Sequence, residues 1–282
     1  MKVGRRSLGA RLTISLPYLW ALVALFPMLF LVGLAFSNET RVDNFWLGFI
    51  PRDPTLGNFG DAFAFMERVG ASLPRALANS VLATGVTVFV CLTLSSLVAW
   101  ALATMEFRAR KILVALFSMG LVVPTSVMII PEVLLFHAVG IEGRPALYLA
   151  YIAFGISLPT LLLTVFFRGL ATEILDAARM DGATGWREFV YVGLPLVRPA
   201  LGAAGMFLFL VFWNEFPLAL ILVRDSGEAT LPLALSSTQG RFGSPFNVIA
   251  SVMLLASLPA LLAFTLGQRQ IVAGLTSGML KR

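Results

Sequence analysis

Long apolar runs recur along the whole chain, and they limit its fold more than any other feature of the sequence. They lie at about residues 16–36, 79–103, 112–137, 147–167, 199–223 and 247–267. A helix of roughly 20 apolar residues crosses the hydrocarbon core of a bilayer and satisfies every backbone group within itself. We therefore expect an all-α integral membrane protein with six transmembrane helices.

Composition supports lipid as the solvent. Only 13% of the residues are charged, and the mean hydropathy is +0.88, whereas a soluble domain carries about 25% charged residues. Because Cys91 and His137 are the single cysteine and histidine, no disulfide framework and no metal site are expected. The first apolar run lacks a small-residue cleavage site before Asn38, so we interpret it as a retained helix and not as a signal peptide.

The basic residues indicate an orientation. Six spans put both termini on one side, and the segments on that side hold 14 of the 21 Lys and Arg residues. Cytoplasmic loops carry the excess of Lys and Arg, so both termini are predicted to face the cytoplasm, in a bacterial inner membrane. The opposite loops 37–78, 138–146 and 224–246 carry 8 acidic residues and the other basic ones. Basic residues scattered in this way fit a topology signal and not a nucleic-acid partner.

The segment between the fourth and fifth spans, residues 168–198, has the pattern of two short amphipathic helices beneath the membrane. Thr172 is a candidate N-cap of the first helix. Asp176 and Arg179 are three residues apart and can pair on one face. Gly182 is placed to end this helix in a left-handed conformation, and Thr184 can cap the second helix.

The second of these helices is expected to end at Leu194-Pro195, where the fifth span begins. In the first short helix, Ala177 and Ala178 have small side chains, so that this face of the helix can fit into a groove on another protein.

The spacing in this segment resembles a known motif. Asp176-Ala177-Ala178, three residues, Gly182, nine residues and Val192-x-Leu194-Pro195 are similar to the EAA loop of permease subunits of binding-protein-dependent ABC importers. Asp176 in place of glutamate and Val192 in place of isoleucine are mild departures from that pattern.

The resemblance implies that this loop docks in a cleft of a cytoplasmic ATPase. The positions that carry the family pattern are Glu173, Asp176, Ala177, Ala178, Arg179, Asp181, Gly182 and Ala183. The implied partners are a sister permease subunit, two copies of the ATPase that bind ATP and Mg²⁺, and an extracytoplasmic solute-binding protein. The chain itself has no P-loop pattern or metal motif, so we expect no bound cofactor and no enzymatic activity.

Other stretches resemble the carbohydrate-uptake branch of this family. They are Leu56-Gly57-Asn58-Phe59, Asn79-Ser80-Val81, the prolines Pro124 and Pro131, Trp213-Asn214-Glu215-Phe216, Gln268-Arg269 and Gly274-Leu275-Thr276-Ser277-Gly278. The resemblance implies a type I importer permease core at residues 75–267. A tail, the first span and an outer loop would precede it (1–74), and a cytoplasmic tail would follow it (268–282). The implied substrate is a mono-, di- or oligosaccharide.

Two carboxylates fall within the predicted spans, where a charge is costly and needs a reason. Glu215 follows Trp213 and Asn214, and an aromatic face, an amide and a carboxylate together suit a sugar. These three residues and Glu132 are therefore candidates for the substrate pathway. The alternative is that Asn214 and Glu215 bond a neighbouring helix or the sister subunit.

Two other functions remain open at this point. An importer for a polyol or a glycerophosphodiester would share the loop motif. An ion-coupled secondary transporter would use Glu132 and Glu215 as proton sites. Stimulation of uptake by ATP, with no effect of an uncoupler, would separate ATP-driven import from ion coupling.

Overall fold

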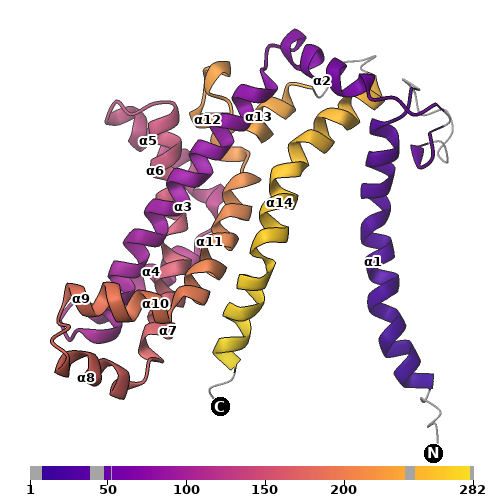
Figure 1. The fold of residues 1–282 in the computed structure, drawn as a ribbon. Coiled ribbons are helices and arrows are strands. Elements are labelled where there is room, and N and C mark those ends of the chain that lie inside the picture. The colour runs from indigo at the N-terminus through magenta and orange to yellow at the C-terminus, as the bar shows by residue number, and fades with distance from the viewer. Residues whose placement is uncertain (1–7, 39–47, 52, 239–244, 280–282) are drawn as a thin grey trace, which may run out of the picture. The chain divides into compact units, whose positions relative to one another are not determined.

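The computed structural model describes residues 8–38, 48–51, 53–238 and 245–279 of the chain (Figure 1). Within these ranges the protein is helical, and its only extended pairing is an isolated bridge between Ser37 and Pro54. The chain forms two compact units. The first comprises residues 1–70 and 237–258, and the second comprises residues 71–236 and 259–282.

The first unit joins three helices at one polar cluster. They are α1 (Leu8–Ala35), α2 (Gly57–Arg68) and the beginning of α14 (Phe246–Met279). Asn58 Nδ2 donates to the carbonyl of Ala35 at 2.9 Å, and Asn247 Nδ2 donates to Asn58 Oδ1 at 3.0 Å. Ser251 Oγ donates to the same Ala35 carbonyl at 3.0 Å. Since all of these residues are buried, the bonds satisfy polar groups that would otherwise be costly to bury.

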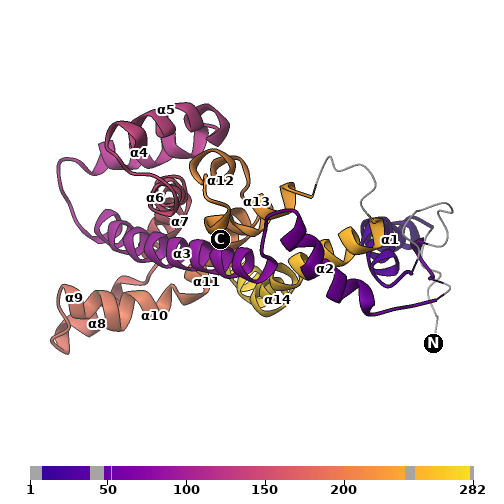
Figure 2. The ribbon, with the colours of Figure 1, turned by 90° about the horizontal axis from the view of Figure 1, so that it is seen from above.

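The second unit contains the remaining helices. They are α3 (Leu73–Thr104), α4 (Arg110–Val122), α5 (Thr125–Ala138), α6 (Arg144–Gly155), α7 (Ser157–Arg168), α8 (Thr172–Met180), α9 (Trp186–Glu188), a π-helical turn (Phe189–Gly193), α10 (Leu194–Leu196), α11 (Arg198–Trp213), α12 (Pro217–Leu222), a 3-10 turn (Ser226–Glu228) and α13 (Leu231–Ser236). Seen from above in Figure 2, α3 runs between α6 and α7 on one side and α11 on the other, and it contacts all three. Buried residues of α3, α6, α11 and α12 form the core there.

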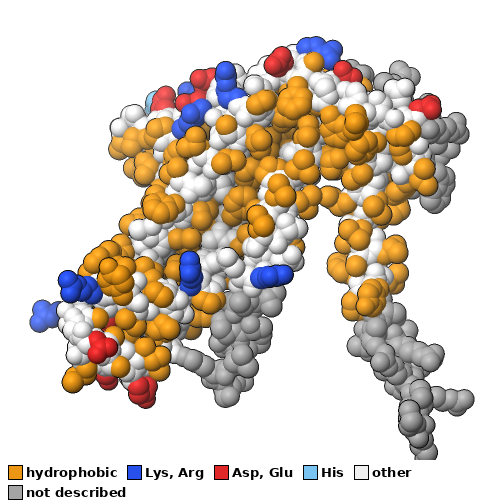
Figure 3. Space-filling view, viewed as in Figure 1, with side chains coloured by type: hydrophobic (Ala, Val, Ile, Leu, Met, Phe, Trp, Pro, Cys, Tyr) orange, Lys and Arg blue, Asp and Glu red, His pale blue; other side chains and the backbone are white. Residues whose placement is uncertain are grey.

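In the described ranges, four helical segments are long and apolar enough to cross a membrane: Leu16–Ala35, Leu73–Thr104, Arg144–Arg168 and Phe246–Gln270. On the face shown in Figure 3, hydrophobic side chains cover the middle of the second unit, and most charged side chains gather toward its two ends. This distribution is the one that a bilayer requires. Two bent pairs of helices among the described residues could each be a further span: Arg110–Val122 with Thr125–Ala138, which matches the predicted span at 112–137, and Trp186–Leu196 with Arg198–Trp213, which includes the first part of the one at 199–223.

The predicted span at 112–137 was expected to be one helix, and the structure breaks it. Between α4 and α5 the axis turns by 108°. Val123 is extended, with ψ 118°, and Pro124 follows it with φ −65° and ψ 136°. Proline removes a backbone donor and disfavours the helical conformation of the residue before it, so the break falls at this pair.

The predicted span at 199–223 is also interrupted. Helix α11 ends at Trp213, and α12 begins at Pro217. Phe216 precedes that proline and leaves the helical conformation, with φ −127°. The polar residues of this span therefore lie at an interruption of the helix, where backbone groups need other partners.

Candidate functional site

Helix α8 ends as the sequence predicts. Gly182 has φ +84°, a left-handed conformation that an L-residue with a side chain adopts only at a cost. Its N–H donates to the carbonyl of Arg179 at 3.0 Å, and the N–H of Ala183 donates to the carbonyl of Ala178 at 2.9 Å. These two bonds form a Schellman motif, which satisfies carbonyls at the end of the helix.

The predicted caps of the two short helices are wrong. Ala171 occupies the cap position of α8, and Thr172 is the first helical residue. Gly185, and not Thr184, precedes α9, and neither cap position makes a side-chain cap bond. Gly185 has φ +54°. The chain needs a second left-handed residue immediately before α9, and glycine meets that need without the steric cost of a β-carbon.

The second short helix ends at Leu196, one residue after the predicted Leu194-Pro195, and α11 begins at Arg198. A π-helical turn precedes the proline, and the N–H of Leu194 donates to the carbonyl of Phe189, five residues earlier. This wider turn lies where the proline ring would otherwise clash with a carbonyl. The axis then bends by 73° between residues 186–196 and α11.

Helix α8 presents most of the predicted coupling residues to solvent. Leu175 is its one buried residue, and it packs in a cluster with Phe167 and Phe189. The exposed coupling residues are Glu173, Asp176, Ala177, Arg179, Asp181 and Gly182, while Ala178 and Ala183 are half-buried. Helix α8 therefore has one anchored edge and a broad free face.

Arg179 makes two ion pairs. Its Nη1 lies 3.1 Å from Asp176 Oδ1, as the spacing predicts, and its Nη2 lies 3.0 Å from Glu188 Oε1. The close contact with the Glu188 carboxylate and its charge raise the pKa of the Arg179 guanidinium. Sequence reasoning missed Glu188 as a partner, because the contact depends on α8 folding back onto α9.

At the interruption after α11, Glu215 is fully engaged. Its Oε1 accepts from the N–H of Leu218 at 2.7 Å, and its Oε2 accepts from the N–H of Ala219 at 3.2 Å. The hydroxyl of Tyr151 in α6 also donates to Oε2, at 2.8 Å. Glu215 thus satisfies the first N–H groups of α12, where the helix dipole favours a negative charge, and links α12 to α6.

The other pathway candidates have different surroundings. Trp213 is 4% exposed and stacks on Phe209, with ring centroids 5.4 Å apart. The amide of Asn214 is exposed and donates to the carbonyl of Leu210 at 2.8 Å. Glu132 Oε2 is buried and has no hydrogen-bond partner in the part of the chain that the structure describes. The structure therefore groups Trp213, Asn214 and Glu215 at one break but shows no bond from Glu132 to it among the described residues.

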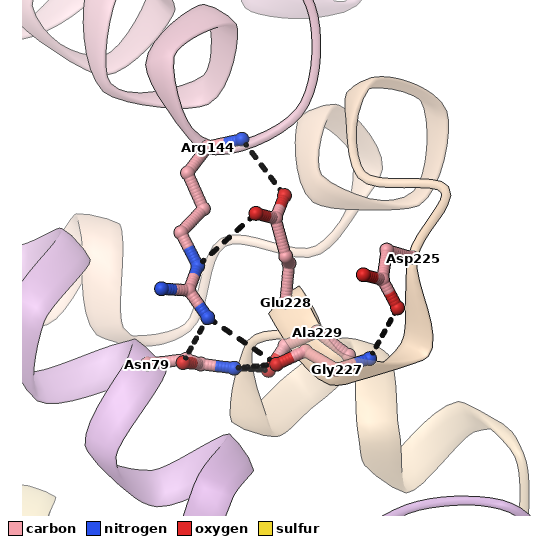
Figure 4. A network of polar contacts seen from close by, with 6 residues as sticks. All are labelled: Asn79, Arg144, Asp225, Gly227, Glu228 and Ala229. Carbon is pink, nitrogen blue, oxygen red and sulfur yellow. Dashed lines mark hydrogen bonds and ion pairs between the residues drawn. The ribbon is translucent and has the colours of Figure 1, made fainter.

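A polar network closes the opposite end of the second unit (Figure 4). Asn79 Nδ2 donates to the carbonyls of Gly227 and Ala229 at 3.0 and 2.9 Å. Arg144 Nη2 donates to Asn79 Oδ1 at 2.8 Å and to the Gly227 carbonyl at 3.2 Å. The backbone N–H of Arg144 donates to Glu228 Oε2 at 3.2 Å. The network fixes the turn at residues 225–229 against α3 and α6, and the sequence signalled only Asn79.

Comparisons with known proteins agree with this architecture. A family model described as "Binding-protein-dependent transport system inner membrane component" matches residues 92–276. The trehalose transport system permease protein SugB of Mycobacterium tuberculosis is 31% identical over 261 residues, which cover 92% of this chain and 93% of that protein. The arabinooligosaccharides transport system permease protein AraQ of Halalkalibacterium halodurans is 32% identical over 277 residues, or 96% and 95% of the two chains.

A solved structure shows the same fold. It is a chain of a bacterial ABC transporter involved in the import of the acidic polysaccharide alginate. The two chains superpose with a TM-score of 0.81 at 19% identity, over 95% of this chain and 99% of the other.

Proposed function

Because the chain belongs to the family of binding-protein-dependent transport system inner membrane components, we propose that it is a permease subunit of an ATP-driven importer that carries a sugar across the cytoplasmic membrane. A member of this family is a multi-pass membrane protein that moves its substrate, and not an enzyme. Among the described residues, the apolar helices and the two bent pairs supply the spans that such a subunit needs.

The free face of α8 is the observation that supports coupling to an ATPase. The helix is short, it ends in a Schellman motif at Gly182, and alanines form part of its accessible surface. A slim, capped helix of this kind can enter a cleft of another protein without loss of its own backbone bonds. ATP-driven closure of the ATPases would then move residues 172–190 and, through them, the spans.

The assembly that we propose has this chain beside a sister permease. Two copies of a cytoplasmic ATPase would bind ATP and Mg²⁺ beneath them, and an extracytoplasmic binding protein would deliver the substrate. The family description supports dependence on a binding protein. Exposed apolar residues on the spans, such as Phe89 at 72% and Leu134 at 65%, suit contact with lipid or with the sister subunit.

The substrate class rests on relatives. Their names specify trehalose and arabinooligosaccharides, which supports a mono-, di- or oligosaccharide here. A polyol or a glycerophosphodiester remains the alternative. Family membership favours ATP-driven import over the ion-coupled mechanism, because the family is defined by its dependence on a binding protein.

We assign different tasks to the four pathway candidates. Asn214, which is exposed, and Glu132, whose Oε2 lacks a partner among the described residues, can offer hydrogen bonds to sugar hydroxyls. Glu215 holds the helix break open through α12 and Tyr151. Trp213 is buried against Phe209 and supports the break from within.

Both termini are proposed to face the cytoplasm, on the basis of the 14 Lys and Arg residues in the segments on that side. A reporter fused after Arg282 should be active only if it works in the cytoplasm. Activity of a periplasm-specific reporter at this position would overturn the orientation.

Reconstitution tests the function as a whole. The complex should take up a radiolabelled sugar into proteoliposomes only with ATP inside and the binding protein outside. An uncoupler should have no effect on this uptake. Uptake that needs an ion gradient and ignores ATP would contradict the proposal.

A further inference from the structure

Glu188 is the only charged side chain that is buried in the described part of the chain. It ends the short helix α9, and its side chain is 8% exposed. A carboxylate removed from water is costly unless a cation compensates it. The compensating group is Arg179, which approaches from a different helix, α8.

The two ion pairs of Arg179 differ in what they connect. The pair with Asp176 lies within α8, and its carboxylate is 66% exposed, so it resembles the exposed pairs that contribute little. The pair with Glu188 spans the connection between α8 and α9. That connection is residues 181–185, and it turns through left-handed glycines at positions 182 and 185. Glycine-rich turns are permissive, so the angle between the two helices is set by the ion pair together with the packing of Leu175 in the cluster that holds Phe189.

The residue after Glu188 is the anchor of this segment in the membrane helices. The ring of Phe189 lies 5.7 Å from Trp100 of α3 and 6.3 Å from Phe167 of α7, centroid to centroid. Gly193 completes the fit, because a β-carbon there would lie 2.6 Å from the Trp100 ring. A continuous set of contacts therefore runs from Arg179 through Glu188 and Phe189 to α3 and α7.

We propose that the Arg179–Glu188 ion pair is the joint that makes α8 move as one body with α3 and α7 when the ATPase closes. Both residues are positioning residues, because they act through the angle of α8 and touch neither nucleotide nor sugar. This inference rests on the proposed function. It assigns to Glu188 a role in the efficiency of coupling, beyond the docking of α8 itself.

The test uses the complete transporter in proteoliposomes and measures sugar transported per ATP hydrolysed. Glu188→Gln removes the charge and keeps the shape, and it should lower this ratio several-fold while ATP hydrolysis continues. Arg179→Lys keeps the charge but loses the planar two-partner geometry, and it should give a smaller decrease. The control is Arg108→Gln, at an exposed position in the loop between α3 and α4 and outside residues 172–190, which should keep the normal ratio.

A second measurement tests directly whether the ion pair fixes the position of α8 relative to α3. Spin labels at Ala177 in α8 and at Met105, which follows α3, should give a narrow distance distribution in the parent complex. Glu188→Gln should broaden that distribution. The measurement is made on assembled complex, so it remains valid if the variant assembles in lower yield. A normal transport ratio together with an unchanged width would overturn the proposal. If α8 does not crosslink to the ATPase in the parent complex, that result would instead contradict the proposed function.

Discussion

The segments at the two ends of the second unit, the turn at residues 225–229 and helix α8, are held against the other helices in different ways. At one end, Asn79 and Arg144 bind the turn at residues 225–229 mainly through bonds to backbone groups (Figure 4). At the other end, α8 is attached through one buried leucine, Leu175, and one ion pair to α9. The first end is held by contacts between residues of this chain. The second has a free face, and we infer that its final geometry depends on a partner.

The largest expected effect is at the end with the free face. In Gly182→Val, a β-branched residue would have to adopt φ +84°, which costs about 1–2 kcal/mol for an ordinary L-residue. The helix end should rearrange, and ATP-driven uptake should fall to background while the chain still folds and assembles with its partners. Gly182→Asn is the control, because asparagine tolerates this conformation, and it should retain most of the uptake. Normal uptake in the valine variant would show that the helix end is not critical.

A smaller effect is expected at the closed end, and it should be on stability and not on coupling. Arg144→Ala leaves the buried Asn79 Oδ1 without its donor and removes the ion pair with Glu228, whose Oε2 still accepts from the backbone N–H of residue 144. A buried group that loses its partner costs about 1–3 kcal/mol. The melting temperature of the complex should therefore drop, with α8 still accessible to the ATPase. Arg224→Ala, at an exposed position beside the same turn, should have no such effect. If Arg144→Ala has the same melting temperature as the Arg224→Ala control, the network does not hold this end.

The smallest effect is expected between the two ends, at the break after α11. Asn214→Ala should slow uptake per assembled complex by up to about tenfold, since one neutral hydrogen bond contributes about 0.5–1.5 kcal/mol. Glu215→Ala should instead reduce the amount of assembled complex, because α12 and Tyr151 lose their acceptor. Glu215→Gln keeps the shape and should assemble better than the alanine variant. Full normalised uptake in Asn214→Ala would remove this residue from the pathway.

The sequence predicted the helical membrane fold, but the continuity of the helices only in part. The length of an apolar run can be counted from the sequence alone. Four predicted spans accordingly appear as helical segments that are long enough to cross the membrane. The 108° turn before Pro124 was not predicted, although two prolines in that run were noted. A proline in an apolar run is compatible with either a mild kink or a full break, and the outcome depends on packing against neighbouring helices.

At the candidate site, contacts close in sequence were predictable, and contacts across a turn were not. The pairing of Asp176 with Arg179 and the left-handed Gly182 follow from helix geometry alone. The pairing of Arg179 with Glu188 requires the path of residues 181–185, which includes a second left-handed glycine that no pattern marked. The contact of Arg144 with the turn at 225–229 joins residues more than 80 positions apart, and no single-sequence rule predicts it.

The central claim is that α8 docks into an ATPase, and a disulfide or bifunctional crosslink tests it most directly. Cysteine at the exposed Ala177 should crosslink to the ATPase in the assembled transporter, and the yield should change with ATP. Cysteine at Ala109, which is exposed in the loop between α3 and α4, is the matched control and should crosslink little. An equal, nucleotide-independent yield at both positions, or none at Ala177 in an active complex, would contradict the account.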